Sequence, residues 1–343
     1  MRAIVAHAAR DLRIENTALR EAADDEVVVR ITRGGICGSD LHYYNHGGFG
    51  TVRLREPMIL GHEVAGEIVA CGSAVTDLTP GQLVAVSPSR PCGQCELCQR
   101  AAYNHCLNMR FYGSAMPFPH IQGAFRETLV AHRSQIAVAD GLSAGAAAMA
   151  EPLAVTVHAA NQAGSLVGKR VLITGCGPIG MLCLMVARAV GAQETVVTDL
   201  ADFPLGLARE VGASQAINVA TEAEALEPYA ANKGYFDVLF ECSGSEQALA
   251  SALPALRPGA TVVQLGLGGD MTVPMQQLTA KEIQLRGSFR FHGEFFTGVS
   301  WMRNGQIDVS PLLTHTLPME SATEAFELAG DRSQAMKVQL ALG

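Results

Sequence analysis

Clusters of basic residues and long apolar runs are both missing from this 343-residue chain, and each absence excludes a class of function. The formal net charge is −8, from 25 Lys and Arg against 33 Asp and Glu, and no segment concentrates the positive charge. A nucleic-acid partner is therefore not expected, because such proteins neutralise phosphates with clustered basic side chains. No uninterrupted apolar run reaches about 18 residues, so no membrane span is expected either.

A secretion leader is also not apparent, since the first residues do not combine a charged start with a long apolar region and a cleavage site. We therefore expect a cytoplasmic protein. Hydrophobic residues make up 48% and charged residues 17% of the chain, which permits a large core and excludes global disorder. At about 100–200 residues per domain, the length predicts two domains. Small-molecule chemistry is the function class that these observations favour.

Four of the nine cysteines fall within fifteen residues, in the spacing C-x2-C-x2-C-x7-C: Cys92, Cys95, Cys98 and Cys106. A disulfide framework is not expected from an odd number of cysteines in a large chain without a secretion leader. Four thiolates can surround one Zn²⁺ tetrahedrally and leave no open position. The segment therefore predicts a structural zinc site in a lobe at about residues 90–108. His105 is a competing ligand, and an iron–sulfur cluster is the alternative.

The hydrophobic pattern divides the chain into two parts near residue 151. Before it, short strands separated by Gly-rich loops predict a β-rich domain over 1–153. After it, short apolar strands alternate with helical stretches, which predicts a doubly wound parallel sheet over 154–288. The tail, 289–343, is too short for a domain and is expected to pack back on the first domain. The expected strands are 26–31, 64–69, 83–86, 169–174, 195–199, 236–241 and 260–266, and the expected helices are 178–190, 205–211 and 246–256.

A glycine-rich turn follows one of these strands and opens a helix: Gly175, Cys176, Gly177, Pro178, Ile179 and Gly180. In this context G-x-G-x-x-G predicts a dinucleotide site, because the glycines let the backbone approach a pyrophosphate at a helix N-terminus. Asp199 ends the next strand and is expected to accept the ribose hydroxyls. It would repel a 2′-phosphate, and residues 200–203 offer no Arg or Lys, so NAD is favoured over NADP. The simpler alternative to a dinucleotide site is that the glycines lie at helix caps and that Asp199 is an N-cap residue.

Two short motifs in the first half carry further candidate metal ligands, Cys37-Gly-Ser-Asp-Leu-His42 and Gly61-His62-Glu63. His62-Glu63 resembles the start of H-E-x-x-H, but position 66 is Gly, which excludes a helical metalloprotease site. Taken singly, Cys37 or His62 would more often be a core residue than a ligand. The interpretation as a metal site therefore rests on the combination with the other motifs.

Together these motifs resemble the zinc-dependent medium-chain alcohol and polyol dehydrogenases, over essentially the whole chain. The resemblance implies a GroES-like catalytic domain, a Rossmann domain, two Zn²⁺ per subunit (one catalytic, one structural), NAD, and a homotetramer or homodimer. Glu151, in Ala-Glu-Pro-Leu, stands where alcohol dehydrogenases have a ligating Cys, which indicates the sorbitol and xylitol branch. Further stretches resemble the branch that oxidises L-idonate: 31–44, 109–116 with 118–120, and 287–291 with 299–301.

The same resemblance assigns roles to individual residues. It implies that Cys37, His62 and Glu63 bind the catalytic zinc, with Glu151 close by, either directly or through a water. An open coordination position would take water or the substrate hydroxyl, whose pKa Zn²⁺ lowers. Ser39 and His42 match the hydroxyl and the imidazole of the family's proton relay. A turn-capping role is the alternative for Ser39.

Four residues are candidates for substrate binding. Arg290 matches an arginine that points at the substrate, and its guanidinium would suit the carboxylate of an aldonate. Arg110 and His120 fall in a stretch specific to the branch, and Tyr43 could hydrogen-bond a substrate hydroxyl. Each of the four could instead be a surface or interface residue.

The implied reaction is the reversible oxidation of L-idonate at C5 to 5-keto-D-gluconate. A polyol dehydrogenase acting on xylitol or sorbitol is the first alternative, and L-threonine dehydrogenase is a weaker one. A zinc-free quinone reductase of the same superfamily should lack Cys37, His62 and the four clustered cysteines, all of which are present. A non-catalytic NAD-binding protein is the alternative from a different class. Metal removal with retained NAD binding would separate it from a zinc enzyme.

Overall fold

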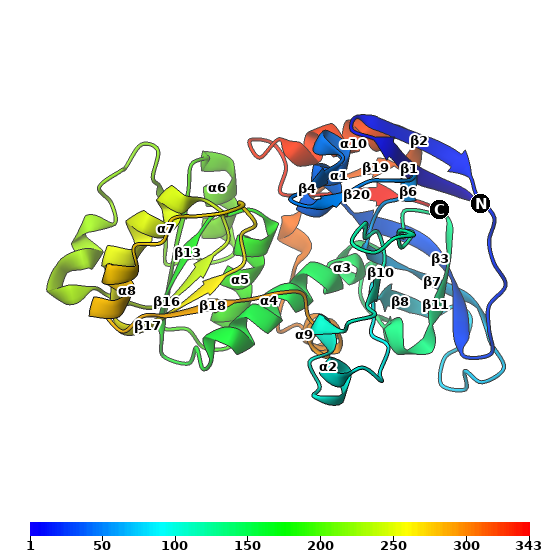
Figure 1. Ribbon diagram of the computed structural model, residues 1–343, viewed down its shortest axis with the longest axis horizontal. Helices are drawn as coiled ribbons and strands as arrows, with labels where there is room; N and C mark the ends of the chain where they lie inside the picture. The colour runs from blue at the N-terminus through cyan, green and yellow to red at the C-terminus, as the bar shows by residue number, and fades with distance from the viewer. The chain divides into compact units, whose positions relative to one another are not determined.

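The computed structural model describes residues 1–343, which divide into two compact units. Unit 1 comprises Met1–Ala154, Phe291–Asp331 and Lys337–Gly343, and unit 2 comprises Val155–Arg290 and Arg332–Met336. Unit 1 is rich in antiparallel strands, and unit 2 is built on a parallel sheet, so the fold class is the mixed α/β fold that the sequence predicts (Figure 1). No helix has both the length and the apolar content that a membrane crossing requires.

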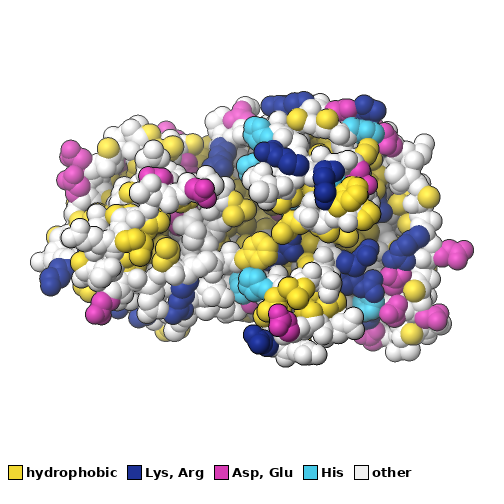
Figure 2. Space-filling model, in the orientation of Figure 1, with side chains coloured by type: hydrophobic (Ala, Val, Ile, Leu, Met, Phe, Trp, Pro, Cys, Tyr) yellow, Lys and Arg dark blue, Asp and Glu magenta, His cyan; other side chains and the backbone are white.

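The C-terminal part differs from the expected division. The sequence predicts that all of 289–343 returns to the first domain, but Arg332–Met336 groups with unit 2, as do residues 289 and 290. Each unit carries charge of both signs on its surface, and Figure 2 shows Lys and Arg side chains interspersed with Asp and Glu side chains over the visible face.

A seven-stranded sheet organises unit 1, in the order β12-β8-β7-β3-β20-β19, with β11 also paired to β3. The central strand β3 (Glu26–Gly35) is rich in β-branched residues, and its Val27, Val29 and Ile31 are fully buried, as expected for a strand inside a sheet. The other strands are β7 (Glu63–Cys71), β8 (Leu83–Val86), β11 (Thr128–His132), β12 (Ile136–Val138), β19 (Leu313–Pro318) and β20 (Lys337–Ala341).

The pairing of β20 with β3 brings the C-terminal residues of the chain beside its N-terminal part, with Gln339–Ala341 antiparallel to Arg33–Gly35. Smaller strands complete unit 1: β1 (Arg2–Ala8), β2 (Asp11–Asn16), β4 (Gly48–Phe49), β5 (Val52–Arg53), β6 (Met58–Ile59), β9 (Ser89–Arg90) and β10 (Arg110–Phe111). Its helices are α1 (Gly38–His46), α2 (Glu96–Gln99), α3 (Ala144–Ala148), α9 (Glu294–Arg303) and α10 (Ala322–Gly330), and α4 (Ala150–Ala163) begins in unit 1 and ends in unit 2.

The parallel sheet of unit 2 has the order β15-β14-β13-β16-β17-β18, which is a doubly wound arrangement. Its strands are β13 (Arg170–Thr174), β14 (Glu194–Asp199), β15 (Gln215–Asn218), β16 (Phe236–Glu241), β17 (Leu256–Gln264) and β18 (Gln284–Gly287). Its helices are α5 (Pro178–Ala189), α6 (Asp202–Glu210), α7 (Glu246–Ala252) and α8 (Met275–Ala280).

Two details of unit 2 depart from the sequence-based expectations. Helix α7 ends at Ala252 and not at residue 256, because Pro254 cannot continue an α-helix and a short 3₁₀ turn, Leu253–Ala255, follows instead. Strands β15 and β18 were not expected at all. All four residues of β18 are exposed at the edge of the sheet, so it lacks the apolar run by which a buried strand is recognised.

Candidate metal centres and dinucleotide pocket

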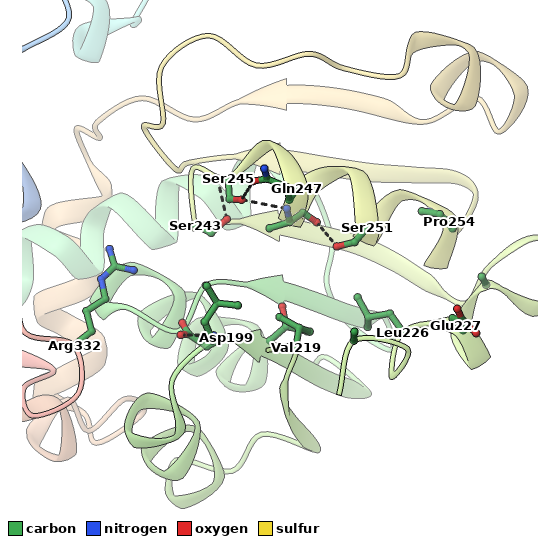
Figure 3. A pocket seen from close by; sticks show the side chains of 16 residues that line it. Asp199, Val219, Leu226, Glu227, Ser243, Ser245, Gln247, Ser251, Pro254 and Arg332 are labelled. Carbon is green, nitrogen blue, oxygen red and sulfur yellow. Dashed lines mark hydrogen bonds between the residues drawn. The ribbon is translucent and has the colours of Figure 1, made fainter. Parts of the chain in front are cut away.

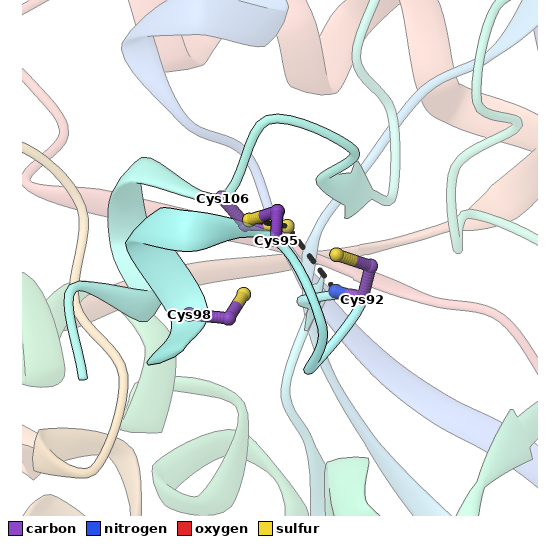
Figure 4. Close-up of side chains that lie close together, drawn as sticks. All are labelled: Cys92, Cys95, Cys98 and Cys106. Carbon is purple, nitrogen blue, oxygen red and sulfur yellow. Dashed lines mark hydrogen bonds between the residues drawn. The ribbon is translucent and has the colours of Figure 1, made fainter. Parts of the chain in front are cut away.

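The four clustered cysteines gather in one loop of unit 1, around the short helix α2 (Figure 4). All are unbonded thiols, and their sulfur atoms lie within 4.8 Å of one another. Backbone N–H groups point at these sulfurs, with Cys92 N and Asn108 N at 3.1 and 3.4 Å from Cys106 Sγ. N–H groups of Gln94 and Cys95 lower the pKa of Cys92 to about 6, so this thiol ionises near neutral pH.

The spacing of these sulfurs fits a zinc ion. A tetrahedral site with Zn–S bonds of about 2.3 Å has sulfur–sulfur edges of about 3.8 Å. Cys95 Sγ and Cys106 Sγ are 4.0 Å apart. The four thiolates converge and accept hydrogen bonds from backbone N–H groups. They can therefore hold a metal without rearrangement of the backbone.

A second group of metal-binding side chains lies in the core of unit 1. Cys37, His62 and Glu63 offer ligand atoms within 4.8 Å of one another, and His62 and Glu63 are 5% and 1% exposed. Glu63 begins β7, and His62 immediately precedes it in the chain. Burial raises the pKa of Cys37 to about 12, so this thiol needs a cation beside it to ionise at neutral pH.

Asp40 fixes the geometry of this group, a role that the sequence analysis did not assign. Cys37 is the N-cap of α1, and Asp40 at the third helical position accepts the Cys37 N–H at 3.0 Å, which closes a capping box. The other Asp40 oxygen accepts the Gly61 N–H at 3.1 Å and lies 3.7 Å from His62 Nδ1. One fully buried carboxylate thus connects the Cys37 segment to the His62 segment, as carboxylates that hydrogen-bond the ligand residues do at metal sites.

Lys337 is the second residue that the sequence analysis missed. Its ammonium donates to both carboxylate oxygens of Glu63, at 2.8 and 2.6 Å, and to the carbonyl of Ile36 at 3.1 Å. Burial alone would lower the pKa of Lys337, but the neighbouring Glu63 and Cys37 reverse the effect and raise it. No local motif marks Lys337, since it reaches the site only because β20 pairs with β3.

Glu151 is the fourth acidic group of the site, and it enters from the first turn of α4. It is 6% exposed, and burial raises its pKa to about 8, while His62 opposes this rise and Glu63 adds to it. It does not belong to the compact group of three ligand atoms. Cys37, Glu63 and Glu151 face a single buried ammonium, and a divalent cation bound among them would favour the ionised forms of Cys37 and Glu151. The donor set therefore fits zinc.

Helix α1 carries the two residues expected to relay protons. Ser39 and His42 are three positions apart, which places them on one face of the helix. Both are partly exposed, and burial lowers the pKa of His42, so its imidazole is neutral at neutral pH. A neutral imidazole can accept a proton, as a relay requires.

Two of the predicted substrate-binding residues are engaged in holding a loop of unit 1. His120 is 5% exposed, its Nε2 accepts the Arg55 N–H at 2.9 Å, and its Nδ1 lies 2.9 Å from the carbonyl of Pro117. Both ring nitrogens are thus used within the protein, so the prediction that His120 contacts substrate is not supported. Tyr43 is 2% exposed, and its hydroxyl accepts the Ala115 N–H at 3.0 Å, which anchors the same loop to α1.

Arg110 also differs from its predicted role. Neighbouring side chains of a strand point to opposite faces, and the ring of the next residue, Phe111, packs against His62 with 5.6 Å between centroids. Arg110 faces the other way, into a cavity of about 650 Å³ beside Cys92 and Asn108. It therefore lies at the cysteine lobe and not at the Cys37 group.

Arg290 is the last residue of the main segment of unit 2. Its guanidinium lies over the ring of Phe289, 5.0 Å from the centroid. Its backbone adopts φ +56°, in the left-handed region that costs a non-glycine residue about 1–3 kcal/mol and that recurs at functional sites.

The glycine-rich turn has the geometry that its sequence predicts. It connects β13 to α5, with Gly177 as N-cap and Pro178 in the first helical turn. A Cβ at Gly180 would lie 1.8 Å from the Gly175 carbonyl oxygen, so only glycine allows α5 to approach the strand this closely. A Cβ at Gly177 would meet nothing within 4 Å, which leaves open space at the helix N-terminus for a pyrophosphate.

Beside this turn, a pocket of about 860 Å³ opens in unit 2 at the carboxyl ends of the strands (Figure 3). Asp199, at the end of β14, lines it together with Gly175, Leu200 and Ser243. The pocket is lined mainly by apolar atoms, with a few polar groups, as small-molecule sites usually are. Arg332 lines it as well, which the sequence did not indicate.

Comparison with known proteins identifies the family. Residues 23–140 match the alcohol dehydrogenase GroES-like domain, and residues 178–304 match the zinc-binding dehydrogenase family. The chain is 46% identical over 315 residues to L-idonate 5-dehydrogenase (NAD(P)(+)) of Escherichia coli K12, with 91% of each chain covered. It is 35% identical over 342 residues to sorbitol dehydrogenase of Gallus gallus, with 98% of this chain and 95% of the relative covered.

The structural comparison agrees with these relationships. The crystal structure of L-idonate 5-dehydrogenase from E. coli matches with a TM-score of 0.95 and 42% identity, over 99% of this chain and 98% of that one. Both halves of the chain and its overall fold thus correspond to a single group of enzymes. The chain belongs to the zinc-binding dehydrogenases, a family of nicotinamide-dependent oxidoreductases with a GroES-like domain.

Proposed function

We propose that the protein oxidises L-idonate reversibly at C5 to 5-keto-D-gluconate, with NAD as the preferred cofactor and two zinc ions per chain. The observation that carries the proposal is the buried group of Cys37, His62 and Glu63, with Glu151 beside it, in a chain similar along its length to an L-idonate 5-dehydrogenase. A polyol dehydrogenase is the second candidate, because sorbitol dehydrogenases also match nearly the whole chain.

In this proposal Cys37, His62 and Glu63 hold the catalytic zinc, and the four cysteines of the 90–108 lobe hold the structural one. When bound, zinc would acidify the C5 hydroxyl and the nicotinamide would take up the hydride. Asp40 holds the segments of Cys37 and His62 together through hydrogen bonds, and Lys337 holds the carboxylate of Glu63 in place. Glu151 supplies a further carboxylate close to the same atoms.

The proton released from the C5 hydroxyl has a route through α1. Ser39 can accept a proton through its hydroxyl oxygen and donate its own onward, and His42 on the same face can take that proton to solvent. The lowered pKa of His42, caused by burial, keeps the imidazole ready to accept. Cofactor preference follows from Asp199, whose carboxylate suits ribose hydroxyls better than a 2′-phosphate.

Recognition of the substrate carboxylate is assigned to Arg290. A guanidinium can bind a carboxylate through two parallel hydrogen bonds, and the left-handed backbone at this residue is a conformation that recurs at functional sites. Tyr43 would act indirectly, because its buried hydroxyl anchors the loop at Ala115 to α1.

The test is the initial rate of NADH formation with L-idonate and with L-iditol, which differ only at C1, as carboxylate and hydroxymethyl. A site with a dedicated cation should favour the acid by about ten- to a hundredfold, and Arg290→Ala should remove that preference. Equal rates, or faster oxidation of L-iditol, would reject the aldonate assignment in favour of the polyol dehydrogenase.

A further inference from the structure

The pocket beside Asp199 contains a positive charge that comes from a distant part of the sequence. Arg332 lies in the short segment Arg332–Met336, which leaves unit 1 and joins unit 2. Among the side chains that line the pocket, it is the only Lys or Arg. In Figure 3, Arg332 and Asp199 are found at the same end of the pocket, and Glu227 and Pro254 at the other.

The guanidinium of Arg332 has no partner within the protein. It is exposed, and it forms no hydrogen bond or ion pair, whereas other arginines of unit 2 do, such as Arg188 with the carbonyl of Gly212. A guanidinium that lines a pocket with all its donors free is available for a ligand anion.

The neighbouring carboxylate is already engaged. Asp199 Oδ2 accepts the Cys176 N–H at 2.6 Å, and its Oδ1 accepts the N–H groups of Leu200 and Ala201 at 2.7 and 3.0 Å. Three N–H donors offset part of its negative charge. This carboxylate therefore repels a nearby phosphate less than a carboxylate without N–H donors would. Arg332 attracts the phosphate, which residues 200–203 cannot do because they include no Arg or Lys.

We propose that Arg332 binds the 2′-phosphate of NADP, so that the pocket accepts both nicotinamide dinucleotides and discriminates only modestly in favour of NAD. The inference rests on the proposed function of the pocket as the cofactor site. A 2′-phosphate carries a charge of about −1.5 to −2 at pH 7, and a guanidinium can bind it through two hydrogen bonds. The pyrophosphate, in contrast, has its own place at Gly177 and the N-terminus of α5.

Nucleotide fragments test this assignment without turnover. We would titrate the full-length protein by calorimetry with 5′-AMP, with 2′,5′-ADP, which adds only the 2′-phosphate, and with 5′-ADP, which adds the second phosphate of the pyrophosphate. The variants are Arg332→Ala, Arg332→Lys and the matched control Arg303→Ala, an exposed arginine of unit 1 that likewise has no partner.

We expect Arg332→Ala to weaken 2′,5′-ADP binding about tenfold and to change 5′-AMP and 5′-ADP binding less than twofold. Arg332→Lys should recover part of the loss, and Arg303→Ala should match the wild type. The advantage of 2′,5′-ADP over 5′-AMP should also shrink at high salt, because the contact is exposed.

Two results would overturn the inference. An unchanged affinity of Arg332→Ala for 2′,5′-ADP would show that the guanidinium does not reach the 2′-phosphate. A loss confined to 5′-ADP, or equal for both diphosphates, would assign Arg332 to the 5′-phosphates instead. If the wild type binds none of the three nucleotides, the proposal that this pocket is the cofactor site is rejected. The first two results would leave that proposal unaffected.

Discussion

Lys337 Nζ lies 2.6 and 2.8 Å from the two carboxylate oxygens of Glu63, although 274 positions separate these residues in the chain. Their side chains are 2% and 1% exposed. The last strand of the protein thus closes the group that also contains Cys37 and His62. A buried ion pair of this kind contributes little net stability as a pair, but the loss of one partner leaves an uncompensated charge in the core.

In the zinc-free protein, Lys337→Met should therefore lower the free energy of unfolding by about 3–5 kcal/mol, because the Glu63 carboxylate would remain buried without a cation. Urea unfolding at pH 7 measures the change. Adding Glu63→Gln to this variant should restore much of the loss, since the stranded charge is then removed as well. Arg30→Met is the matched control, because it breaks an exposed pair with Glu67 between neighbouring strands and should cost less than about 1 kcal/mol. A similar cost for both variants would contradict the argument.

Metal content should follow the two groups of ligands independently. Cys95→Ser should lower zinc from two ions per chain to about one, because the remaining three thiolates no longer form a closed tetrahedral site. Cys71→Ser should keep both ions, since Cys71 lies outside either group and its thiol donates to the carbonyl of Leu78. Elemental analysis of the purified proteins gives the counts. Two zinc ions in the Cys95 variant would show that the lobe does not bind one.

Gly180→Ala should disturb both the fold and the cofactor site, because the new Cβ would overlap the Gly175 carbonyl oxygen. We expect a fall in the melting temperature and at least a tenfold loss of affinity for NAD. Gly177→Ala should leave the melting temperature unchanged, since its Cβ meets no protein atom within 4 Å. It should lower the affinity for NAD, because the Cβ fills the space for the pyrophosphate.

Gly206→Ala serves as the control for both glycine variants. It lies within α6, where a Cβ meets nothing, and should stabilise the protein by up to about 1 kcal/mol with no effect on NAD. Normal NAD affinity in Gly177→Ala would place the pyrophosphate elsewhere.

Acid stability should depend on Glu26. Hydrogen bonds from Arg20 lower the pKa of Glu26 from 4.5 to about 2, with Ala23 N–H and Arg90 adding to the effect. A carboxyl whose folded-state pKa is lowered stabilises the fold above its unfolded pKa, and this stabilisation disappears as the pH falls from about 4.5 to 2. The difference in unfolding free energy between the wild type and Glu26→Gln should be constant above pH 5 and shrink below it.

Urea unfolding of both proteins between pH 3 and 7 would measure this difference and cancel the contributions that they share. Glu324→Gln, at an exposed carboxyl without a partner, should show no such dependence. A difference between the wild type and Glu26→Gln that stays constant down to pH 3 would count against the role of Arg20.

Features formed by local sequence could be predicted, and those formed by distant strand pairing could not. The turn from Gly175 to Gly180 needs only its own residues and the strand before it, so its conformation follows from the motif. The four cysteines of the lobe are likewise close in sequence. Lys337 and Arg332 carry no motif, and their places depend on where the C-terminal segment runs in the folded chain.

The same reasoning explains why two predicted substrate residues have other roles. His120 and Arg110 are polar residues in a stretch that resembles the L-idonate branch, and sequence alone cannot show where a side chain points. His120 has both nitrogens occupied by backbone groups, and Arg110 lies on the face of β10 opposite to Phe111. In a strand, a shift of one residue exchanges the two faces, so proximity in sequence to a site says little about contact with it.

The chain passes between its two units at four points, after Ala154, Arg290, Asp331 and Met336. Recombination at a single pair of breakpoints therefore cannot exchange the whole of unit 2, because this unit consists of two separate segments, 155–290 and 332–336. A chimera that receives only residues 155–290 from this protein would acquire Asp199 but keep its host's residue in place of Arg332. Under the role proposed for Arg332, cofactor selectivity in such hybrids should then be inherited from both parents, because a five-residue segment outside the Gly175–Gly180 turn would contribute to the choice between NAD and NADP.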